Sequence, residues 1–315
     1  MSSKSVNTST RDLLQGYMDK TGKTLKQVGK QLGYSESMVC RYFSDNPGGD
    51  ISAFEAAVID MLAAEDRDER WSEIYFSTQA VEECFLIFDL IRASRDVGII
   101  SSEPGVGKSV ASVRYSEANK TAILCQVPKW AAGHWGLQKL IWEQLDTRRY
   151  DPSAESKADY LVRRLSGSDR LLILDNAQRI QKAGLEWLLD FAELTHCPVA
   201  LVGNPAQILE RLRSDAALSS RIGIRKEIST STKDKAAVKW LGDASDAMVT
   251  AMWPEAHSEI RTLAREAAMQ SGHLRRLNKQ LRIAIRISES PAWDKSRAAA
   301  FAYARTLLVS TDMSD

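Results

Sequence analysis

Short runs of consecutive aliphatic residues occupy the middle of the chain, and spacing typical of helices lies between them. The four runs are "VGIISS" at 97–102, "TAILCQV" at 121–127, "LLILD" at 171–175 and "PVALVGN" at 198–204. Strands that are apolar at every position are typical of a parallel sheet covered by helices on both faces. The pattern therefore predicts an α/β domain in which a parallel sheet is flanked by helices.

Both ends of the chain have helical spacing without a strand pattern. Segments such as "SEIRTLAREAAMQSG" and "LRRLNKQLRIAIRI" predict an all-α C-terminal part. The N-terminal part has short helical patterns interrupted by the turn signal "NPGGD", and the charged stretch "AAEDRDER" favours a connector or a solvated helix end. The predicted divisions are 1–63 for an N-terminal domain, 64–80 for a linker, 81–228 for the α/β core and 229–315 for a helical C-terminal extension.

Composition narrows the class of protein only modestly. The chain has 315 residues, a net charge of +1 and 44% hydrophobic residues, which are ordinary values for a globular protein of two or three domains. Any affinity for nucleic acid must therefore come from local basic patches. The four cysteines are dispersed without a CxxC pair, which argues against a zinc site and indicates a reducing compartment. The sequence has no secretory h-region and no apolar run of membrane length, so a cytoplasmic protein without membrane contact is expected.

The first apolar run leads into a glycine-rich loop and then into a helical pattern, "VGIISSEPGVGKSVA". Gly105 and Gly107 allow backbone N–H groups to surround phosphates, and the Lys108 cation can reach β- and γ-phosphates. The Ser109 hydroxyl is a suitable ligand for Mg²⁺. An incidental turn is the alternative, but the downstream strand that ends in an acid favours a phosphate-binding loop for ATP. The predicted contacts are Ser102, Glu103, Pro104, Gly105, Val106, Gly107, Lys108, Ser109 and Val110.

Polar residues end two later apolar runs. Asp175 follows four aliphatic residues and is predicted to orient the ligands of Mg²⁺, with an ordinary turn aspartate as the alternative. Asn204 ends the next run and is predicted to position the attacking water near the γ-phosphate. Asn176 follows Asp175 directly, and Gln178, two residues further on, is able to orient a water molecule.

The segment "TLKQVGKQLGYSESMVCRYFSD", at 24–45, has the layout of a helix-turn-helix. Gly33 supplies the turn and Ser35 is the expected cap of the second helix. Lys26, Ser37 and Arg41 are predicted DNA contacts, although only Arg41 is a strong partner for a base or a phosphate. Little sequence selectivity is therefore expected. The alternative is a helical hairpin that contacts protein.

Two further basic groups are candidate DNA contacts. On one helix, Arg275, Lys279, Arg282 and Arg286 share a stripe opposite the leucines of the same segment. A solvated helix face is the alternative for this charge run. The second group lies in the segment after the second apolar run and comprises Arg148, Arg149 and Lys157.

The motifs "SEPGVGKS", "LLILDNAQ", "ALVGN", "LSSRIGIR" and "GHLRRLN" occur in an order that resembles the AAA+ ATPases. More narrowly, they resemble the Mu B, TnsC and IstB family, whose members choose target DNA for transposases. The resemblance implies a P-loop NTPase core with a helical lid, which binds ATP and Mg²⁺. It also implies a homo-oligomer in the form of a ring or filament. The implied partners are double-stranded DNA, bound with little sequence specificity, and a transposase. The residue roles it implies are a Walker A loop at Ser102–Ser109, a Walker B acid at Asp175, a sensor-1 residue at Asn204, a sensor-2 arginine at Arg275, and an arginine finger at Arg221 with Arg225 as its substitute.

The chain departs from the family pattern at two positions. Ser102 replaces the first glycine of the loop, which is harmless if its backbone angles suit an L-residue. Asn176 replaces the glutamate that usually follows the Walker B acid. An amide cannot accept a proton from water at neutral pH, and loss of general-base help typically lowers a rate by ~10²–10⁴. We therefore expect an ATPase that binds ATP and hydrolyses it slowly, unless positioning of the water alone suffices.

Two other functions remain compatible with the sequence. One is a nucleotide-switched regulator or initiator that reads an operator, for which the helix-turn-helix would give specific footprints. The other is a helicase loader, for which DNA binding would be secondary. An ATP-dependent coat on DNA of arbitrary sequence distinguishes the target-selection function from both.

Overall fold

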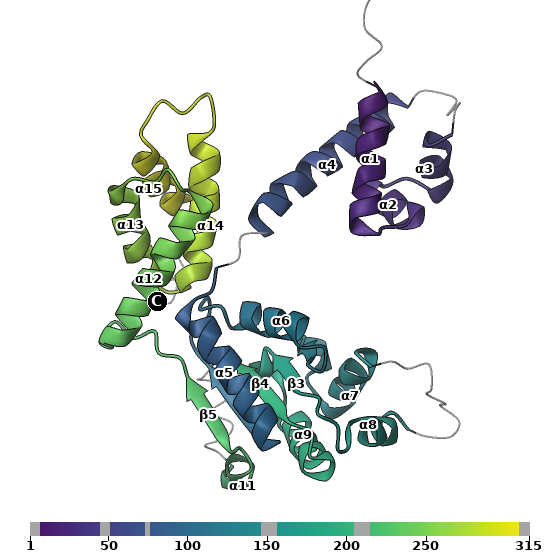
Figure 1. Ribbon diagram of the computed structural model, residues 1–315, viewed down its shortest axis with the longest axis vertical. Helices are drawn as coiled ribbons and strands as arrows, with labels where there is room; N and C mark the ends of the chain where they lie inside the picture. Colours follow the sequence, from purple (N-terminus) through teal and green to yellow (C-terminus); the bar gives the residue numbers. More distant parts are fainter. Residues whose placement is uncertain (1–6, 45–50, 73–75, 146–155, 205–214, 309–315) are drawn as a thin grey trace, which may run out of the picture. The chain divides into compact units, whose positions relative to one another are not determined.

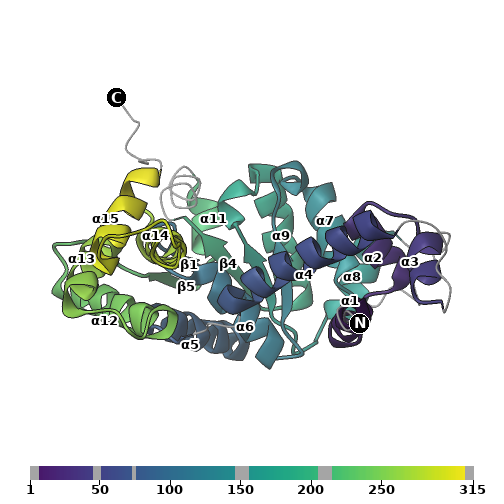
Figure 2. The ribbon, with the colours of Figure 1, turned by 90° about the horizontal axis from the view of Figure 1, so that it is seen from above.

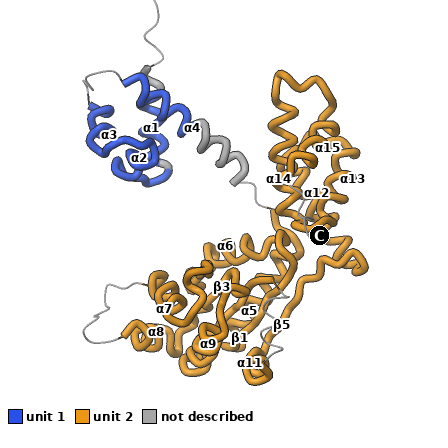
Figure 3. Tube along the Cα trace, turned by 180° about the vertical axis from the view of Figure 1, so that it is seen from behind, with its two compact units in different colours: residues 1–75 blue, residues 76–315 orange. Residues whose placement is uncertain are grey.

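A computed structural model describes residues 7–44, 51–72, 76–145, 156–204 and 215–308. The chain divides into two compact units, residues 1–75 and residues 76–315 (Figure 3). None of the described helices is long and apolar enough to cross a membrane.

The first unit is helical and has its own small core. Its helices are α1 (Asn7–Thr21), α2 (Leu25–Leu32), α3 (Glu36–Tyr42) and α4 (Ser52–Ser72). Thr24 and Gln27 form a capping box that begins α2, and Gly33, with φ 77°, ends it. Ser35 accepts a hydrogen bond from the backbone N–H of Met38 and begins α3. The buried core side chains are Leu14, Tyr17, Val28, Val39, Tyr42, Phe54 and Val58.

The second unit is built on a five-stranded parallel sheet (Figure 1). The strands are β1 (Val97–Ser101), β2 (Ile123–Gln126), β3 (Leu172–Asp175), β4 (Val199–Gly203) and β5 (Ile224–Glu227), in the order β2-β3-β4-β1-β5. All residues of β1, β3 and β4 are buried, as the continuous apolar runs predict. Because the strands are parallel, their carboxyl ends lie at one edge of the sheet, where loops gather into a site.

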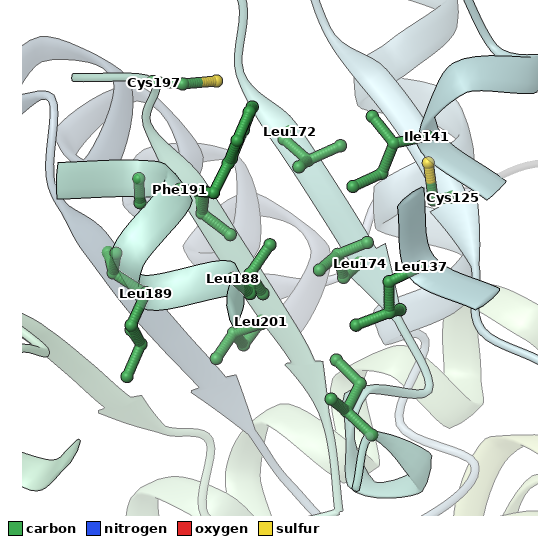
Figure 4. Close-up of a cluster of buried hydrophobic side chains, with 14 of the residues drawn as sticks. Cys125, Leu137, Ile141, Leu172, Leu174, Leu188, Leu189, Phe191, Cys197 and Leu201 are labelled. Carbon is green, nitrogen blue, oxygen red and sulfur yellow. The ribbon is translucent and has the colours of Figure 1, made fainter. Parts of the chain in front are cut away.

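Helices cover both faces of this sheet (Figure 2). Helices α5 (Gln79–Ser94) and α6 (Lys108–Ala118) pack together on one face, and α7 (His134–Glu143), α8 (Lys157–Leu165) and α9 (Lys182–Thr195) pack on the other. The second face contains an apolar core in which strand and helix side chains interdigitate (Figure 4). Its central members include Leu137, Ile141, Leu172, Leu174, Leu188, Phe191 and Leu201.

The short helix α11 (Ala216–Ser220) precedes β5, and among the described residues beyond β5 only helices occur. These are α12 (Lys235–Met252), α13 (Ser258–Ala268), α14 (His273–Ser288) and α15 (Arg297–Leu307). Leu277, Leu281 and Ile285 of α14 are buried, and the buried Gln280 donates a hydrogen bond to the carbonyl oxygen of Phe301 over 3.0 Å. The predicted linker at 64–80 differs from the structure, because α4 continues to Ser72 and α5 begins at Gln79.

Candidate nucleotide-binding site

The glycine-rich loop connects the buried strand β1 to helix α6. Gly105 and Gly107 have φ values of 95° and 112°, in the left-handed region that side chains disfavour. Gly107 is the residue from which α6 begins. Ser102 is 1% exposed and is not among the residues with positive φ, so the serine that replaces the first loop glycine is not strained.

Lys108 is folded onto the carbonyl groups of its own loop. Its Nζ donates hydrogen bonds to the carbonyl and hydroxyl oxygens of Ser102, both over 2.7 Å, and to the carbonyl of Glu103 over 3.0 Å. Burial lowers the pKa of Lys108 from its ordinary value of 10.5 to about 8. The loop therefore contains a desolvated cation whose partners are neutral, which is a favourable environment for an anion such as a phosphate. Ser109, one residue further, is half-buried, and Val110 is exposed.

Polar groups from β3 and β4 lie at the same edge of the sheet. Asp175 is 3% exposed, and its Oδ1 accepts a hydrogen bond from the backbone N–H of Asn176 over 2.9 Å. The side chain of Gln178 connects the two strand ends. Its Nε2 donates to Asn176 Oδ1 over 3.5 Å, and its Oε1 accepts from the backbone N–H of Asn204 over 3.3 Å. The residues predicted from the ends of two separate apolar runs therefore form one polar cluster.

Asn176 has a left-handed backbone, with φ 60° and ψ 36°. Asparagine adopts this conformation more readily than glutamate, because its short side chain bonds to nearby backbone. The turn between β3 and α9 therefore favours asparagine on conformational grounds.

The C-terminal helices approach the loop at the start of α14. The backbone N–H of Arg275 donates to the carbonyl oxygen of Gly105 over 3.2 Å. A Cβ atom on Gly105 would lie 1.9 Å from the carbonyl oxygen of Gly272, so only glycine allows this approach. His273, with φ 41°, is buried, and its Nδ1 lies 2.9 Å from the carbonyl oxygen of Ala268. The Arg275 side chain itself is exposed.

The two candidate finger arginines make contacts within this chain. Arg221 follows α11 and forms ion pairs with Asp190, over 2.8 Å, and with Glu193, both on α9. Arg225 lies on β5 and donates to the hydroxyl of Ser219 over 2.7 Å. The sequence pattern gave no indication of these contacts.

The predicted DNA contacts fall on separate surfaces. In the first unit, Lys26, Ser37 and Arg41 are exposed. On α14, Lys279 is exposed and Arg282 is half-buried. The Lys157 ammonium lies 5.0 Å from the centroid of the Trp142 ring. Arg148 and Arg149 lie outside the described residues.

A glycine loop between β1 and α6, with an acid at the end of β3 in a parallel sheet, is the arrangement found in P-loop nucleotide-binding folds. Residues 91–212 match the family described as AAA domain. The fold is also similar to that of the ORC2 protein of Aeropyrum pernix in its ADP form, with a TM-score of 0.56 and 17% identity over 76% of this chain and 72% of that chain. The ORC1 protein of Aeropyrum pernix in complex with DNA has a TM-score of 0.53 and 18% identity, over 74% of this chain and 66% of that chain.

Among individual proteins, the chain is similar to the ATP-dependent target DNA activator B of Escherichia phage Mu. The two are 26% identical over 292 residues, which cover 86% of each chain. The Mu-like prophage FluMu DNA transposition protein B of Haemophilus influenzae is 20% identical over 197 residues, which cover 61% of this chain and 68% of the relative. The resemblance to AAA+ ATPases and to the phage Mu B protein that the motifs indicate is thereby confirmed.

Proposed function

We propose that this chain is an ATP-dependent DNA-binding protein that assembles on target DNA and recruits or activates a transposase. The observation that carries the proposal is the match along 86% of both chains to a protein named for ATP-dependent activation of target DNA. The glycine loop supports the proposal, because its left-handed glycines and the half-buried cation of Lys108 suit the phosphates of ATP.

In this proposal the loop Ser102–Val110 binds the phosphates of ATP. The backbone N–H groups that its glycines expose contact phosphate oxygens, and Lys108 exchanges its neutral carbonyl partners for charged ones. Ser109 and Asp175 would hold Mg²⁺, which when bound neutralises charge on the phosphates. The fit rests on the Ser109 hydroxyl at the start of α6 and on the buried carboxylate of Asp175 at the same edge of the sheet.

Hydrolysis is proposed to be slow. Asn176 and Gln178 can orient water through their amides, but neither can accept its proton at neutral pH. Asn204 is tied to Gln178 through its backbone and is proposed to complete the positioning of water. The outcome is a protein that remains in its ATP-bound form for long periods.

Assembly is proposed to join neighbouring subunits through ATP. Arg221 would exchange its pairs with Asp190 and Glu193 for the γ-phosphate of an adjacent subunit, and Arg275 would contact the phosphates bound by its own chain. Ion pairs at exposed carboxylates contribute only about 0–1 kcal/mol, so this exchange has a small energetic cost.

DNA contacts are proposed at the helix-turn-helix formed by α2 and α3, through Lys26, Ser37 and Arg41, and at Lys279 and Arg282 of α14. Glu36 is exposed beside Ser37, and a carboxylate at this position repels phosphate, so strong operator reading is not expected. Binding to arbitrary duplex, weakened by salt, is the expected behaviour.

Electron microscopy of the full chain with random-sequence duplex tests this function. Ordered assemblies on DNA are expected with ATP and not with ADP or without nucleotide, because ATP stabilises the form that it binds best. Assemblies that form equally well without nucleotide would contradict the proposal. A strong preference for one operator over competing random DNA would instead favour a nucleotide-switched regulator.

A further inference from the structure

Two tryptophans on the segment after β2 are almost fully exposed. Trp130, in the 3₁₀-helix η1 (Lys129–Ala131), has 76% of its surface exposed, and Trp135, in the first turn of α7, has 73% exposed. Tryptophan is large and is mostly buried in folded proteins, so two such side chains five residues apart indicate a surface that binds something.

The segment that carries these tryptophans contains lysines and no acid, and its last lysine, Lys139, forms an exposed ion pair with Glu143 over 3.8 Å. No aspartate or glutamate occurs between Glu117 and Glu143 in the sequence, whereas Lys120, Lys129 and Lys139 lie in that interval. Lys129 and Lys139 are exposed, and Lys139 lies one helical turn beyond Trp135, on the same side of α7. Lysines interleaved with exposed aromatic rings fit DNA, because cations contact phosphates while the apolar rings pack against sugars.

The segment that carries the tryptophans is fastened to the polar cluster at the end of β3. The backbone N–H of Val127 donates to the carbonyl oxygen of Asp175 over 2.9 Å, and Arg179 donates to the carbonyl of Val127 over 3.0 Å. Further along, the backbone N–H of Gln181 donates to the carbonyl of Ala132 over 2.9 Å. The turn that contains Asn176 is therefore bonded to the tryptophan segment on both sides of that residue.

We propose that Lys129, Trp130, Trp135 and Lys139, here called the tryptophan surface, form a DNA contact whose occupancy is coupled to the nucleotide site. The proposal rests on the proposed function and adds to it the place of contact and the route of communication. The indoles pack against the sugars of duplex DNA, and the two lysines contact its phosphates. A shift of this segment on DNA moves the Asp175–Gln181 turn through its hydrogen bonds, so DNA and ATP each strengthen the binding of the other.

The test compares the double variant Trp130→Ala/Trp135→Ala with Tyr303→Ala, which removes a half-exposed aromatic ring from α15. Each protein is saturated with a non-hydrolysable ATP analogue and titrated with a 30-base-pair random duplex. Removal of both indoles takes away the apolar surface that they bury against DNA, so a loss of at least about fivefold is expected for the double variant and none for Tyr303→Ala.

Salt dependence separates the role of the rings from that of the lysines. The tryptophan variant should lose affinity equally at every salt concentration, because indoles release no counterions. Lys129→Gln should reduce the slope of log affinity against log salt by about one. The conservative variant Trp130→Tyr/Trp135→Tyr should regain most of the affinity, since a phenol ring can also pack against sugars.

The coupling between DNA binding and ATP binding is measured by titrating ATP with and without duplex. Saturating duplex should raise the ATP affinity of the wild type, and the tryptophan-to-alanine variant should lose this gain while keeping its ATP affinity in the absence of DNA. That retained affinity also serves as the control for folding. If the variant binds duplex as tightly as the wild type, the tryptophan surface is not a DNA contact.

Two other results would also overturn the inference. If the variant fails to assemble with ATP in sedimentation experiments without DNA, the surface is an interface between copies of this chain. If the wild type binds no duplex in any nucleotide state, the proposed function itself is wrong, and the inference falls with it.

Discussion

Gly105 and Arg275 are joined by a hydrogen bond from the backbone N–H of Arg275 to the carbonyl oxygen of Gly105, over 3.2 Å. The bond fastens the start of α14 to the glycine loop, more than 160 residues away in the sequence. Gly272 lies against the same loop residue, so the contact is made by backbone alone. We therefore expect the start of α14 to move together with the loop that is proposed to bind phosphate.

Gly105→Ala tests this contact. The new Cβ would lie 1.9 Å from the carbonyl oxygen of Gly272, and φ at this position is 95°, so both the contact and the local conformation are disfavoured. We expect a lower melting temperature and an ATP affinity reduced by at least about tenfold, because the loop and α14 must separate. Thermal unfolding and nucleotide titration measure the two effects.

Gly242→Ala is the matched control for that substitution. Gly242 lies inside α12, and a Cβ there meets no atom within 4 Å. Alanine is favoured over glycine within helices by about 0.5–1 kcal/mol, so this variant should be as stable as the wild type or more stable. Equal behaviour of the two variants would mean that the approach of Gly272 to Gly105 is unimportant.

From the lowered pKa of Lys108 we predict opposite effects of pH on folding stability and on ATP affinity. Burial holds its pKa at about 8, below the ordinary value of 10.5. Between pH 8 and pH 10.5, Lys108 is protonated in the unfolded chain and mostly deprotonated in the folded, nucleotide-free protein. The free energy of unfolding without nucleotide should therefore increase with pH in this range. ATP requires the protonated form, so its affinity should fall above pH 8, towards tenfold for each further pH unit. Calorimetry in buffers of different ionisation enthalpy should show proton uptake on binding.

Variants of Lys108 separate this effect from general pH sensitivity. Lys108→Ala should abolish detectable ATP binding while the protein remains folded, because the main cation of the loop is lost. Lys108→Arg keeps its charge throughout this range, so any residual binding should be independent of pH between 8 and 10. ATP affinity like that of the wild type in Lys108→Ala would disprove the assignment of the phosphate loop.

Arg221 is proposed to leave its pairs with Asp190 and Glu193 and to contact the γ-phosphate of an adjacent subunit. Because that contact joins two subunits, we expect Arg221→Ala to retain ATP binding and fail to form ordered assemblies. Asp190→Asn/Glu193→Gln should have the opposite effect and lower the protein concentration at which ATP-dependent assemblies appear. Sedimentation velocity with and without ATP measures both. If only Arg225→Ala prevents assembly, the finger is the β5 arginine.

Much of the α/β core was predictable from the sequence, because the patterns that define its strands and its glycine loop lie within short segments. The buried strands β1, β3 and β4 are apolar at every position, and the loop carries its glycines, lysine and serine in sequence. Strand β5 gave no comparable signal. It lies at the edge of the sheet and has the sequence "IRKE", in which only Ile224 is apolar.

The contacts that the sequence did not predict are those made between distant segments. The approach of Gly272 to Gly105, the pairing of Arg221 with Asp190, and the hydrogen bonds from the tryptophan segment to the β3 turn all depend on the packing of the fold. The exposure of Trp130 had only a weak signal, a bulky residue beside lysine in a short loop. The left-handed conformation of Asn176 likewise depends on how β3 turns into α9.

The replacement of the usual glutamate by Asn176 predicts a slow ATPase that a single substitution should accelerate. Asn176→Glu places a base beside Asp175 and should raise turnover on saturating DNA by at least about tenfold, within the range of general-base catalysis. The left-handed backbone at φ 60° disfavours a longer side chain, so Asn176→Glu should also lower the folding stability by about 1 kcal/mol.

Asn176→Gln is the matched control, because glutamine has the same length as glutamate and the same backbone strain but cannot accept a proton. Steady-state ATPase assays of the three proteins should give Asn176→Glu the highest rate and leave Asn176→Gln no faster than the wild type. The faster variant should also leave DNA sooner. Rapid hydrolysis by the wild type, unchanged by glutamate, would show that Asn176 and Gln178 position water well enough without a base, and the phosphate loop would be unaffected by that result.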